Sequence, residues 1–150
     1  MARKTKSARA PQLQTADFVR LASFRYALRR FLRFSEAAAV KVGLTGQHYQ
    51  AMLAIRASAQ GRGIAISELA RQLLIKHNSA VGLVDRLVAH GLVTRESSAE
   101  DLRKVLVRLS RKGEHVLGRL AAVHRLKLRR IGPDIHRILG ELTGAWRRGD

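Results

Sequence analysis

The stretch ISELARQLLIKHNSAVGLVDRLVAHGLVTRESSAEDLRKVLVRLSRKG, residues Ile66–Gly113, decides the fold that we predict for this chain. In its first half, apolar residues recur at helical spacing on one side of two short helices, which are separated by a turn near Ile75–His77. Ser67 is a suitable N-cap for the first helix, and Gly91 is a suitable left-handed residue to end the second. This half therefore predicts a helix-turn-helix.

Two β-rich runs follow the second predicted helix. They are Leu92–Glu96 and Arg103–Leu109, and the polar segment Ser97–Asp101 joins them. Runs of this composition around a short polar link are typical of a β-hairpin, with Arg103 beside its tip. The whole stretch therefore predicts a winged helix-turn-helix, in which the hairpin is the wing.

Several segments of this stretch carry a family resemblance. LVDRL, HGLVTR, D-L-R, V-L-V-R-L-S and R-K-G resemble, in order and spacing, the motifs of the MarR family of bacterial transcription regulators, and the likeness extends upstream to GLTGQHYQAMLAI. The resemblance implies a mainly α fold with a small β-hairpin wing and a helical dimerisation lobe built from the N- and C-terminal helices. It also implies a homodimeric repressor that binds an inverted-repeat operator in double-stranded DNA.

The resemblance also assigns DNA contacts by position. In the family, the second helix of the pair enters the major groove and the wing reaches the flanking minor groove. On the helix, it implies contacts by Asn78, Ser79, Gly82 and Arg86. On the wing, it implies contacts by Ser97, Ser98, Asp101 and Arg103. A narrow minor groove attracts a guanidinium, serine hydroxyls can donate to phosphates, and the aspartate is expected to act mainly by forming the turn.

One departure from the family pattern lies on the predicted reading helix. Many relatives have Thr and Arg where this chain has Val81 and Gly82. A glycine in a helix costs about 1 kcal/mol relative to alanine, and it also removes a side chain that could read a base. The sequence of the operator therefore stays open.

The charge of the chain points to a polyanionic partner. Its 29 Lys and Arg residues against 11 Asp and Glu residues give a net charge of +18. Such an excess favours nucleic acid, although charge alone equally permits a merely basic surface or an RNA-binding or nucleoid-like protein without sequence preference. The D-L-R hairpin and the lack of an aromatic stacking platform in the basic regions favour duplex DNA.

Other classes of protein lack support in the sequence. The chain has no cysteine, which excludes disulfides and thiol redox sensing. We find no paired carboxylates in an apolar setting, no phosphate-binding loop and no nucleophile with a base, and the six histidines are scattered, so we expect no enzyme, metal site or cofactor. No apolar run has the length of a membrane span and no secretory signal is visible, so we expect a bacterial cytoplasmic protein.

The chain is long enough for one domain with a real core, flanked by further segments. Residues 1–12 are predicted to be a disordered basic arm, which either touches phosphates or only aids solubility. Residues 13–42 and 111–150 are predicted to form the helical dimerisation region, and residues 43–110 the winged helix-turn-helix.

The predicted dimerisation region consists of helices with apolar seams. One helix is expected from about Thr15 to Val40, and a second from a cap at Ser110 to about Ile131, where Gly132 and Pro133 stop it before a final helix. A self-packed monomer is the alternative to a homodimer. The side chains that we expect to hold the dimer are Leu21, Phe24, Phe31, Leu139, Leu142 and Trp146.

A further helix, capped by Thr45 and ending near Ser58, precedes the winged stretch. In the family, the equivalent helix faces the cleft between the two lobes, where some members bind small aromatic effectors. The resemblance therefore offers three effector-binding candidates, for which ordinary core packing is the alternative. They are His48, Tyr49 and Met52.

Overall fold

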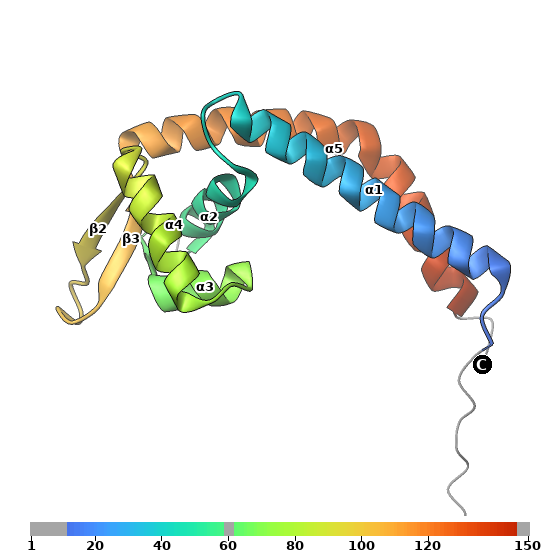
Figure 1. The fold of residues 1–150 in the computed structure, drawn as a ribbon, viewed down its shortest axis with the longest axis horizontal. Helices are drawn as coiled ribbons and strands as arrows, with labels where there is room; N and C mark the ends of the chain where they lie inside the picture. Colours follow the sequence, from blue (N-terminus) through green and yellow to red (C-terminus); the bar gives the residue numbers. More distant parts are fainter. Residues whose placement is uncertain (1–11, 59–61, 147–150) are drawn as a thin grey trace, which may run out of the picture. The chain divides into compact units, whose positions relative to one another are not determined.

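The computed structural model describes residues 12–58 and 62–146 of the chain. Within these ranges the chain forms five α-helices and a small antiparallel sheet, so the predicted mainly α class is confirmed (Figure 1). The elements in chain order are α1 (Thr15–Val40), α2 (Gly46–Ala57), β1 (Ile64–Ala65), α3 (Ile66–Leu73), α4 (His77–Ala89), β2 (Val93–Ser97), β3 (Val105–Leu109) and α5 (Arg111–Trp146).

The chain divides into two compact units. One, here called the terminal unit, consists of Met1–Phe31 and Arg129–Asp150, and the other, the central unit, consists of Leu32–Leu128. The two long helices α1 and α5 each contribute one end to each unit. Neither described range contains a helix that is long and apolar enough to cross a lipid bilayer.

The sheet of the central unit confirms the predicted hairpin and adds a third strand. Its strand order is β1-β3-β2, with both pairs antiparallel. In the hairpin, Val93 pairs with Leu109. The short strand β1 pairs Ile64 with Val107 and was not predicted, because two residues are too few to show a strand period.

The two helices α3 and α4 confirm the predicted helix-turn-helix, but the start of α3 differs from the prediction. Its N-cap is Ala65, whose side chain makes no capping hydrogen bond, so the assignment of Ser67 as N-cap was wrong. The reason lies in the sheet, since Ala65 is paired with Leu106 and the extended chain turns into the helix directly after it.

The end of α4 follows the prediction. Gly91 adopts a left-handed conformation with φ +69°, and the N–H of Leu92 donates to the carbonyl of Leu87 at 2.9 Å. This pattern satisfies carbonyls that the last turn of a helix leaves without partners. The left-handed glycine thus turns the chain out of α4 and into β2.

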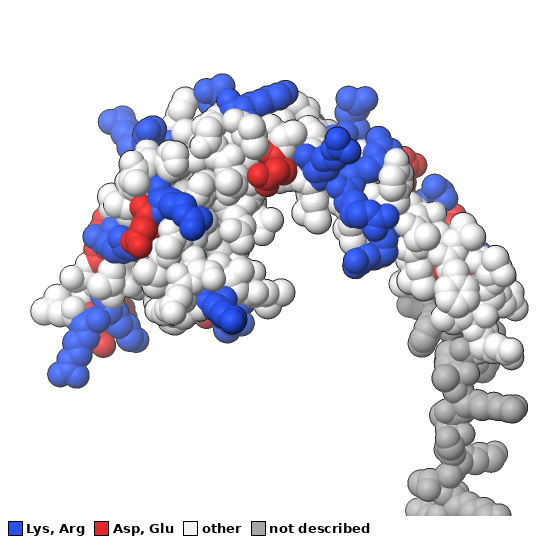
Figure 2. Space-filling view, in the orientation of Figure 1, with Lys and Arg blue, Asp and Glu red and all other residues white. Residues whose placement is uncertain are grey.

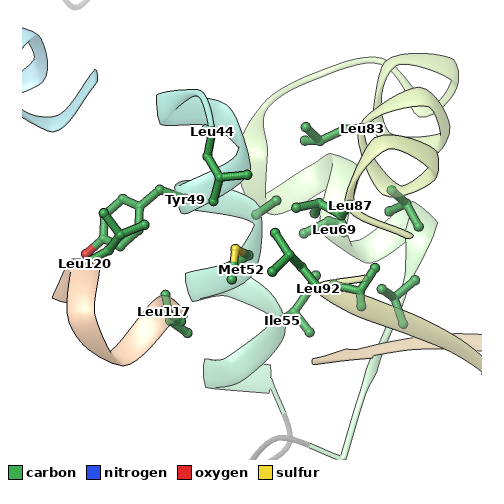
Figure 3. Close-up of a cluster of buried hydrophobic side chains, with 14 of the residues drawn as sticks. Leu44, Tyr49, Met52, Ile55, Leu69, Leu83, Leu87, Leu92, Leu117 and Leu120 are labelled. Atoms are coloured by element: carbon green, nitrogen blue, oxygen red, sulfur yellow. The ribbon is translucent and has the colours of Figure 1, made fainter. Parts of the chain in front are cut away.

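The core of the central unit lies between α2, α3, α4 and the sheet (Figure 3). Met52 and Ile55 of α2 face Leu69 of α3 and Leu87 of α4, and all four side chains are almost fully buried. Burying an aliphatic side chain of this size contributes about 1.5 to 3 kcal/mol. This shared core fixes the polar side of α4 on the outside of the unit.

The long helix α5 corrects the prediction of two helices. Ser110 caps it as expected, since its Oγ accepts the N–H of Gly113 at 3.0 Å, but the helix continues through Pro133 to Trp146. A proline inside a helix removes one hydrogen bond and clashes with the carbonyl four residues earlier and with the Cβ of the preceding residue. The preceding residue is Gly132, which has no Cβ, so the second of these clashes is absent here.

Gly113 has a separate structural role at the start of α5. A Cβ at this position would lie 2.0 Å from the carbonyl oxygen of Leu92. The first turn of α5 therefore sits directly on the backbone that leads into β2, and only glycine fits there.

In the terminal unit, the first part of α1 lies along the last part of α5 (Figure 1). Of the predicted dimer residues, Leu21 and Leu139 are 44% and 40% exposed, and Phe24, Phe31 and Leu142 are half-buried. The side chain of Trp146 lies outside what the structure describes, as do residues 1–11 of the predicted basic arm.

Candidate nucleic-acid interface

The outer side of α4 presents the residues predicted to read the major groove. Ala80, Leu83 and Leu87 are buried on its inner side, which leaves the opposite side to solvent. Of the predicted contact residues there, Asn78, Ser79 and Arg86 are exposed and Gly82 is half-buried. The structure thus brings all four to the outside of one 13-residue helix.

The backbone N–H groups at the N-terminus of α4 receive no hydrogen bond acceptor from the N-cap side chain. Its N-cap is Lys76, whose side chain makes no capping hydrogen bond. The N–H groups of the first helical turn point along the axis and, together with the helix dipole, favour an anion such as a DNA phosphate. Lys76 and His77 are exposed at this end and add basic groups, although the sequence reasoning did not single them out.

Gly82 leaves open space on the outer side of α4. A Cβ built there would meet nothing closer than the Nη2 atom of Arg86, at 3.9 Å. The protein itself therefore does not require glycine at this position. The missing side chain shortens the distance at which a second molecule could approach the helix backbone.

The tip of the wing is a tight, internally bonded turn. The Oδ1 atom of Asp101 accepts the N–H of Arg103 at 3.0 Å, and its carbonyl oxygen accepts the N–H of Lys104 at 2.9 Å. The N–H of Ser98 donates to the carbonyl of Lys104 at 2.8 Å and closes the turn. The carboxylate of Asp101 is thus used by the turn, as predicted.

This turn holds the Arg103 side chain out in solvent. Arg103 is exposed, and no carboxylate of the described residues forms an ion pair with it. Lys104 beside it is exposed as well, and basic side chains project from this end of the hairpin (Figure 2). The guanidinium is therefore accessible to an external anion.

Other arginines near the interface have partners within the chain. Arg95 of β2 forms an ion pair with Asp85 of α4, which links the wing to the outer side of that helix. Arg108 of β3 lies 2.9 Å from Glu96 of β2 and braces the two strands of the hairpin. The first pair therefore connects the wing to α4, and the second connects the two strands of the wing.

Arg71 on α3 is also held by an acid. Its Nη2 lies 2.5 Å from Glu68 Oε1, and Gln72 donates to the same carboxylate at 2.9 Å. These hydrogen bonds lower the pKa of Glu68 to about 2, so this carboxylate stays charged beside Arg71. Arg71 is therefore less available to an external anion than the basic groups at the start of α4 and at the tip of the wing.

The three effector candidates do not meet at an open site. All three are buried: Met52 lies in the core, Tyr49 stacks on His124 of α5 with ring centroids 4.1 Å apart, and His48 faces His90 of α4 at 5.8 Å. Burial raises the pKa of the Tyr49 hydroxyl and lowers the pKa of the His48 imidazole. In the free chain these residues act as packing groups.

The sequence reasoning missed the buried role of His124. Its ring lies between the aromatic rings of Phe34 and Tyr49, and its nitrogens contact Ser35 and Leu120. A lone histidine within an amphipathic helix carries no signal in the sequence that separates this position from a solvated one.

Comparisons with known proteins agree with this geometry. The sequence profile of the MarR family matches residues 42–104, which hold α2, the helix-turn-helix and most of the wing. The transcriptional activatory protein BadR of Rhodopseudomonas palustris is 28% identical over 102 residues, which are 68% of this chain and 53% of BadR. The chain thus spans about half the length of that curated relative.

Solved structures show the same fold over most of the chain. AbsC, a MarR family transcriptional regulator from Streptomyces coelicolor, is 21% identical with a TM-score of 0.73, covering 91% of this chain and 93% of AbsC. A mutant of MepR from S. aureus, bound to an oligodeoxyribonucleotide, is 13% identical with a TM-score of 0.62, covering 93% and 100%. The winged helix-turn-helix architecture is therefore shared with regulators that include a DNA-bound one.

Proposed function

We propose that this chain is a member of the MarR family of DNA-binding transcription regulators, whose sequence profile matches residues 42–104, and that it binds an inverted-repeat operator as a homodimer and represses transcription there. The observation that carries this proposal is the pairing of two basic features in one braced module. They are the uncapped N-terminus of α4 and the guanidinium of Arg103 on the wing, which forms no ion pair within the described part of the chain.

In the proposed complex, α4 lies in the major groove and Arg103 in the adjacent minor groove. Phosphate contacts come from the first turn of α4 and from Ser97 and Ser98, and they position the module without reading sequence. Asn78, Ser79 and Arg86 face the base edges, where amide, hydroxyl and guanidinium groups each find donors or acceptors. The narrow minor groove attracts Arg103 through its negative potential.

The terminal unit supports the proposed homodimer. It exposes more large apolar side chains than an isolated soluble protein usually tolerates in one region. These side chains are Phe18, Val19, Leu21, Tyr26 and Leu139. A second copy related by a two-fold axis would cover them and would present two α4 helices to one duplex, about 10 bp apart.

Repression is the mode of regulation that requires the fewest further contacts. A dimer bound across a promoter excludes other proteins from the same duplex, whereas activation needs an additional surface that recruits one. BadR carries the name of an activatory protein, so a reporter driven from the selected operator decides between the two modes. Repression predicts a rise in reporter output when the gene for this chain is removed.

An effector, if it acts on this fold at the predicted helix, must enter by displacing buried side chains. The aromatic stack of Tyr49 on His124 joins α2 to α5, and Phe34 of α1 packs against the same histidine with ring centroids 5.6 Å apart. A small aromatic molecule that replaces one of these rings would change the packing of α2 beneath the reading helix. Competition between such molecules and operator DNA tests this part of the proposal.

The decisive experiment is selection of bound genomic fragments at moderate salt. A recurrent inverted repeat whose half-sites lie about one helical turn apart supports the proposal. Uniform recovery of fragments, or equal recovery of RNA, would instead support a non-specific basic nucleic-acid-binding protein.

A further inference from the structure

Three side-chain acceptors bind backbone N–H groups at the start of α2. Glu36 of α1 accepts the N–H of Gly46 through Oε2 at 2.6 Å. At the N-cap of α2, Thr45 Oγ1 accepts the N–H of His48 at 3.2 Å, and His48 Nδ1 accepts the N–H of Thr45 at 3.1 Å. His48 thus completes the capping box that satisfies the first turn of the helix.

The second nitrogen of His48 has no such partner. Because Nδ1 accepts a hydrogen bond, the neutral ring carries its proton on Nε2. His48 is only 5% exposed, and its Nε2 is the one buried side-chain nitrogen or oxygen of the described residues without a hydrogen-bond partner. A buried donor without an acceptor costs free energy, so His48 is unfavourable at this place even when its ring is neutral.

The surroundings of His48 oppose a positive charge. The ring of His90, the C-cap residue of α4, lies 5.8 Å away between centroids, and Arg86 is one turn earlier on the same helix. Burial, then His90 and then Arg86 lower the pKa of His48, against a smaller opposite influence of Glu36. On the far side of His90, Lys112 of α5 donates to its carbonyl at 2.9 Å and adds a further cation.

Protonation of this ring has a defined structural consequence. The added proton must go to Nδ1, the only nitrogen with a free electron pair, and Nδ1 is the atom that accepts the N–H of Thr45. Two N–H groups would then point at each other, and a cation would stand at the positive end of the α2 dipole. The ring can relieve both unfavourable interactions, the opposed N–H groups and the cation at the helix N-terminus, only by leaving its place between α2 and the end of α4.

We propose that His48 is a proton-operated switch, whose protonation in mild acid releases the first turn of α2 from the end of α4 and lowers the affinity for operator DNA. This inference rests on the proposed DNA-binding function. The coupling is direct, because Arg86 and His90 at that end of α4 lie on the helix that faces the major groove. Glu36 connects the same junction to α1, a helix that also runs into the terminal unit.

The chain offers a matched variant, His48→Gln. Glutamine is a regular partner of threonine in the capping box, so it keeps an acceptor for the N–H of Thr45, but it does not titrate. The measurement is affinity for the selected operator at constant ionic strength, at about pH 7.5 and about pH 5.5. We expect the parent to lose about three- to tenfold in affinity over this interval and His48→Gln to lose less than about twofold.

A readout without DNA separates the switch from the function. In the free protein, the NMR titration of the His48 ring should have a midpoint below the usual histidine value, and the amide signals of Thr45 and His90 should shift with the same midpoint. If the parent and His48→Gln have the same pH profile of operator affinity, the switch is refuted and DNA binding stands. If no duplex is bound at about pH 7.5, the proposed function fails, and the shared midpoint alone decides whether the ring is a switch.

Discussion

The Nε2 atom of His124 lies 2.8 Å from the Oγ of Ser35, a residue 89 positions earlier in the chain. On the other side of the ring, Nδ1 lies 2.7 Å from the carbonyl oxygen of Leu120, which can only accept, so Nδ1 donates and Nε2 accepts the serine hydroxyl. Both ring nitrogens are thus satisfied in a buried position. This pair ties α1 to α5 within the central unit.

Removing the hydroxyl should therefore destabilise the central unit. In Ser35→Ala, the buried Nε2 of His124 loses its donor, which costs about 1 to 3 kcal/mol. The measurement is the free energy of unfolding from urea titrations of the two proteins. The control is Ser79→Ala, at an exposed position of α4, which should leave the unfolding free energy unchanged. Equal stability of parent and Ser35→Ala would show that this hydrogen bond contributes nothing.

Two variants should distinguish the contacts that position the protein on DNA from the contacts that read its base sequence. Arg103→Ala removes a charge that we propose to lie in the minor groove, so affinity should fall by about 1 to 3 kcal/mol and the salt slope should become shallower by about one unit. Ser79→Ala should leave the salt slope as it is and relax the preference among bases inside the half-site. The measurement is a salt series of binding isotherms on operator, flank-swapped and core-swapped duplexes.

The Arg103→Ala variant is the stricter test of the proposed placement of the wing. Discrimination should suffer mainly at flanking A·T positions, where the groove is narrow. If this variant binds every duplex as the parent does, with the same salt slope, the placement of the wing in the minor groove is wrong.

Gly82→Ala should raise stability and lower DNA affinity together. The added methyl group has room in the free protein, since its nearest neighbour is Arg86 Nη2 at 3.9 Å, and alanine in a helix is favoured over glycine by about 1 kcal/mol. The same methyl stands on the side of α4 that we propose to face the major groove, where it would block close approach. Thermal unfolding and operator binding measure the two effects. Unchanged affinity would mean that α4 does not approach DNA closely at this point.

Leu74 offers a test of backbone strain in the turn between α3 and α4. It adopts a left-handed conformation with φ +54°, and its side chain is 91% exposed. A leucine pays about 1 to 2 kcal/mol for this conformation, whereas glycine adopts it freely. Leu74→Gly should therefore stabilise the protein by up to about 1 kcal/mol after the entropy of glycine is subtracted. Leu74→Ala, which keeps the strain, should have little effect on thermal unfolding.

The dimer prediction is tested by placing charge on the exposed apolar side chains of the terminal unit. Leu21→Asp and Leu139→Asp should shift the sedimentation of the protein from dimer to monomer, because a buried unpaired carboxylate is strongly unfavourable at an interface. The control is Leu102→Asp, at an exposed position on the wing. A parent protein that sediments as a monomer at micromolar concentration would refute the homodimer.

Much of the fold could be predicted from local patterns. The apolar spacing of α3 and α4 and the β-rich runs around Ser97–Asp101 predicted the helix-turn-helix and the hairpin, because period, composition and turn chemistry are properties of adjacent residues. The caps at Thr45 and Ser110 were predicted for the same reason, since each bonds to a residue three positions later. The exposed polar side of α4 follows directly from its buried side.

The two errors have different causes, which are a pairing between distant residues for Ser67 and a neighbouring glycine for Pro133. The N-cap of α3 is Ala65 and not Ser67, because Ala65 pairs with Leu106 in the sheet. The residues near Ala65 in the sequence do not indicate this pairing. At Pro133 the local signal pointed to a helix end, but the long flanking helix and the glycine before the proline allow α5 to continue. The roles of the predicted DNA-contact and dimer residues stay predictions, because they depend on molecules other than this chain.

The sequence by itself determined the helix-turn-helix, the hairpin and which side of each short helix faces water, because these follow from motifs, periodicity and capping over a few residues. The tertiary structure decided what burial does to individual polar groups. His48 and His124 are both single histidines on helices, yet one has an unsatisfied nitrogen beside His90 and the other has both nitrogens bonded. Whether a buried donor has an acceptor depends on residues from α1, α2, α4 and α5 that lie together in the fold. Packing of the helices, and not the neighbouring sequence, brings these residues into contact.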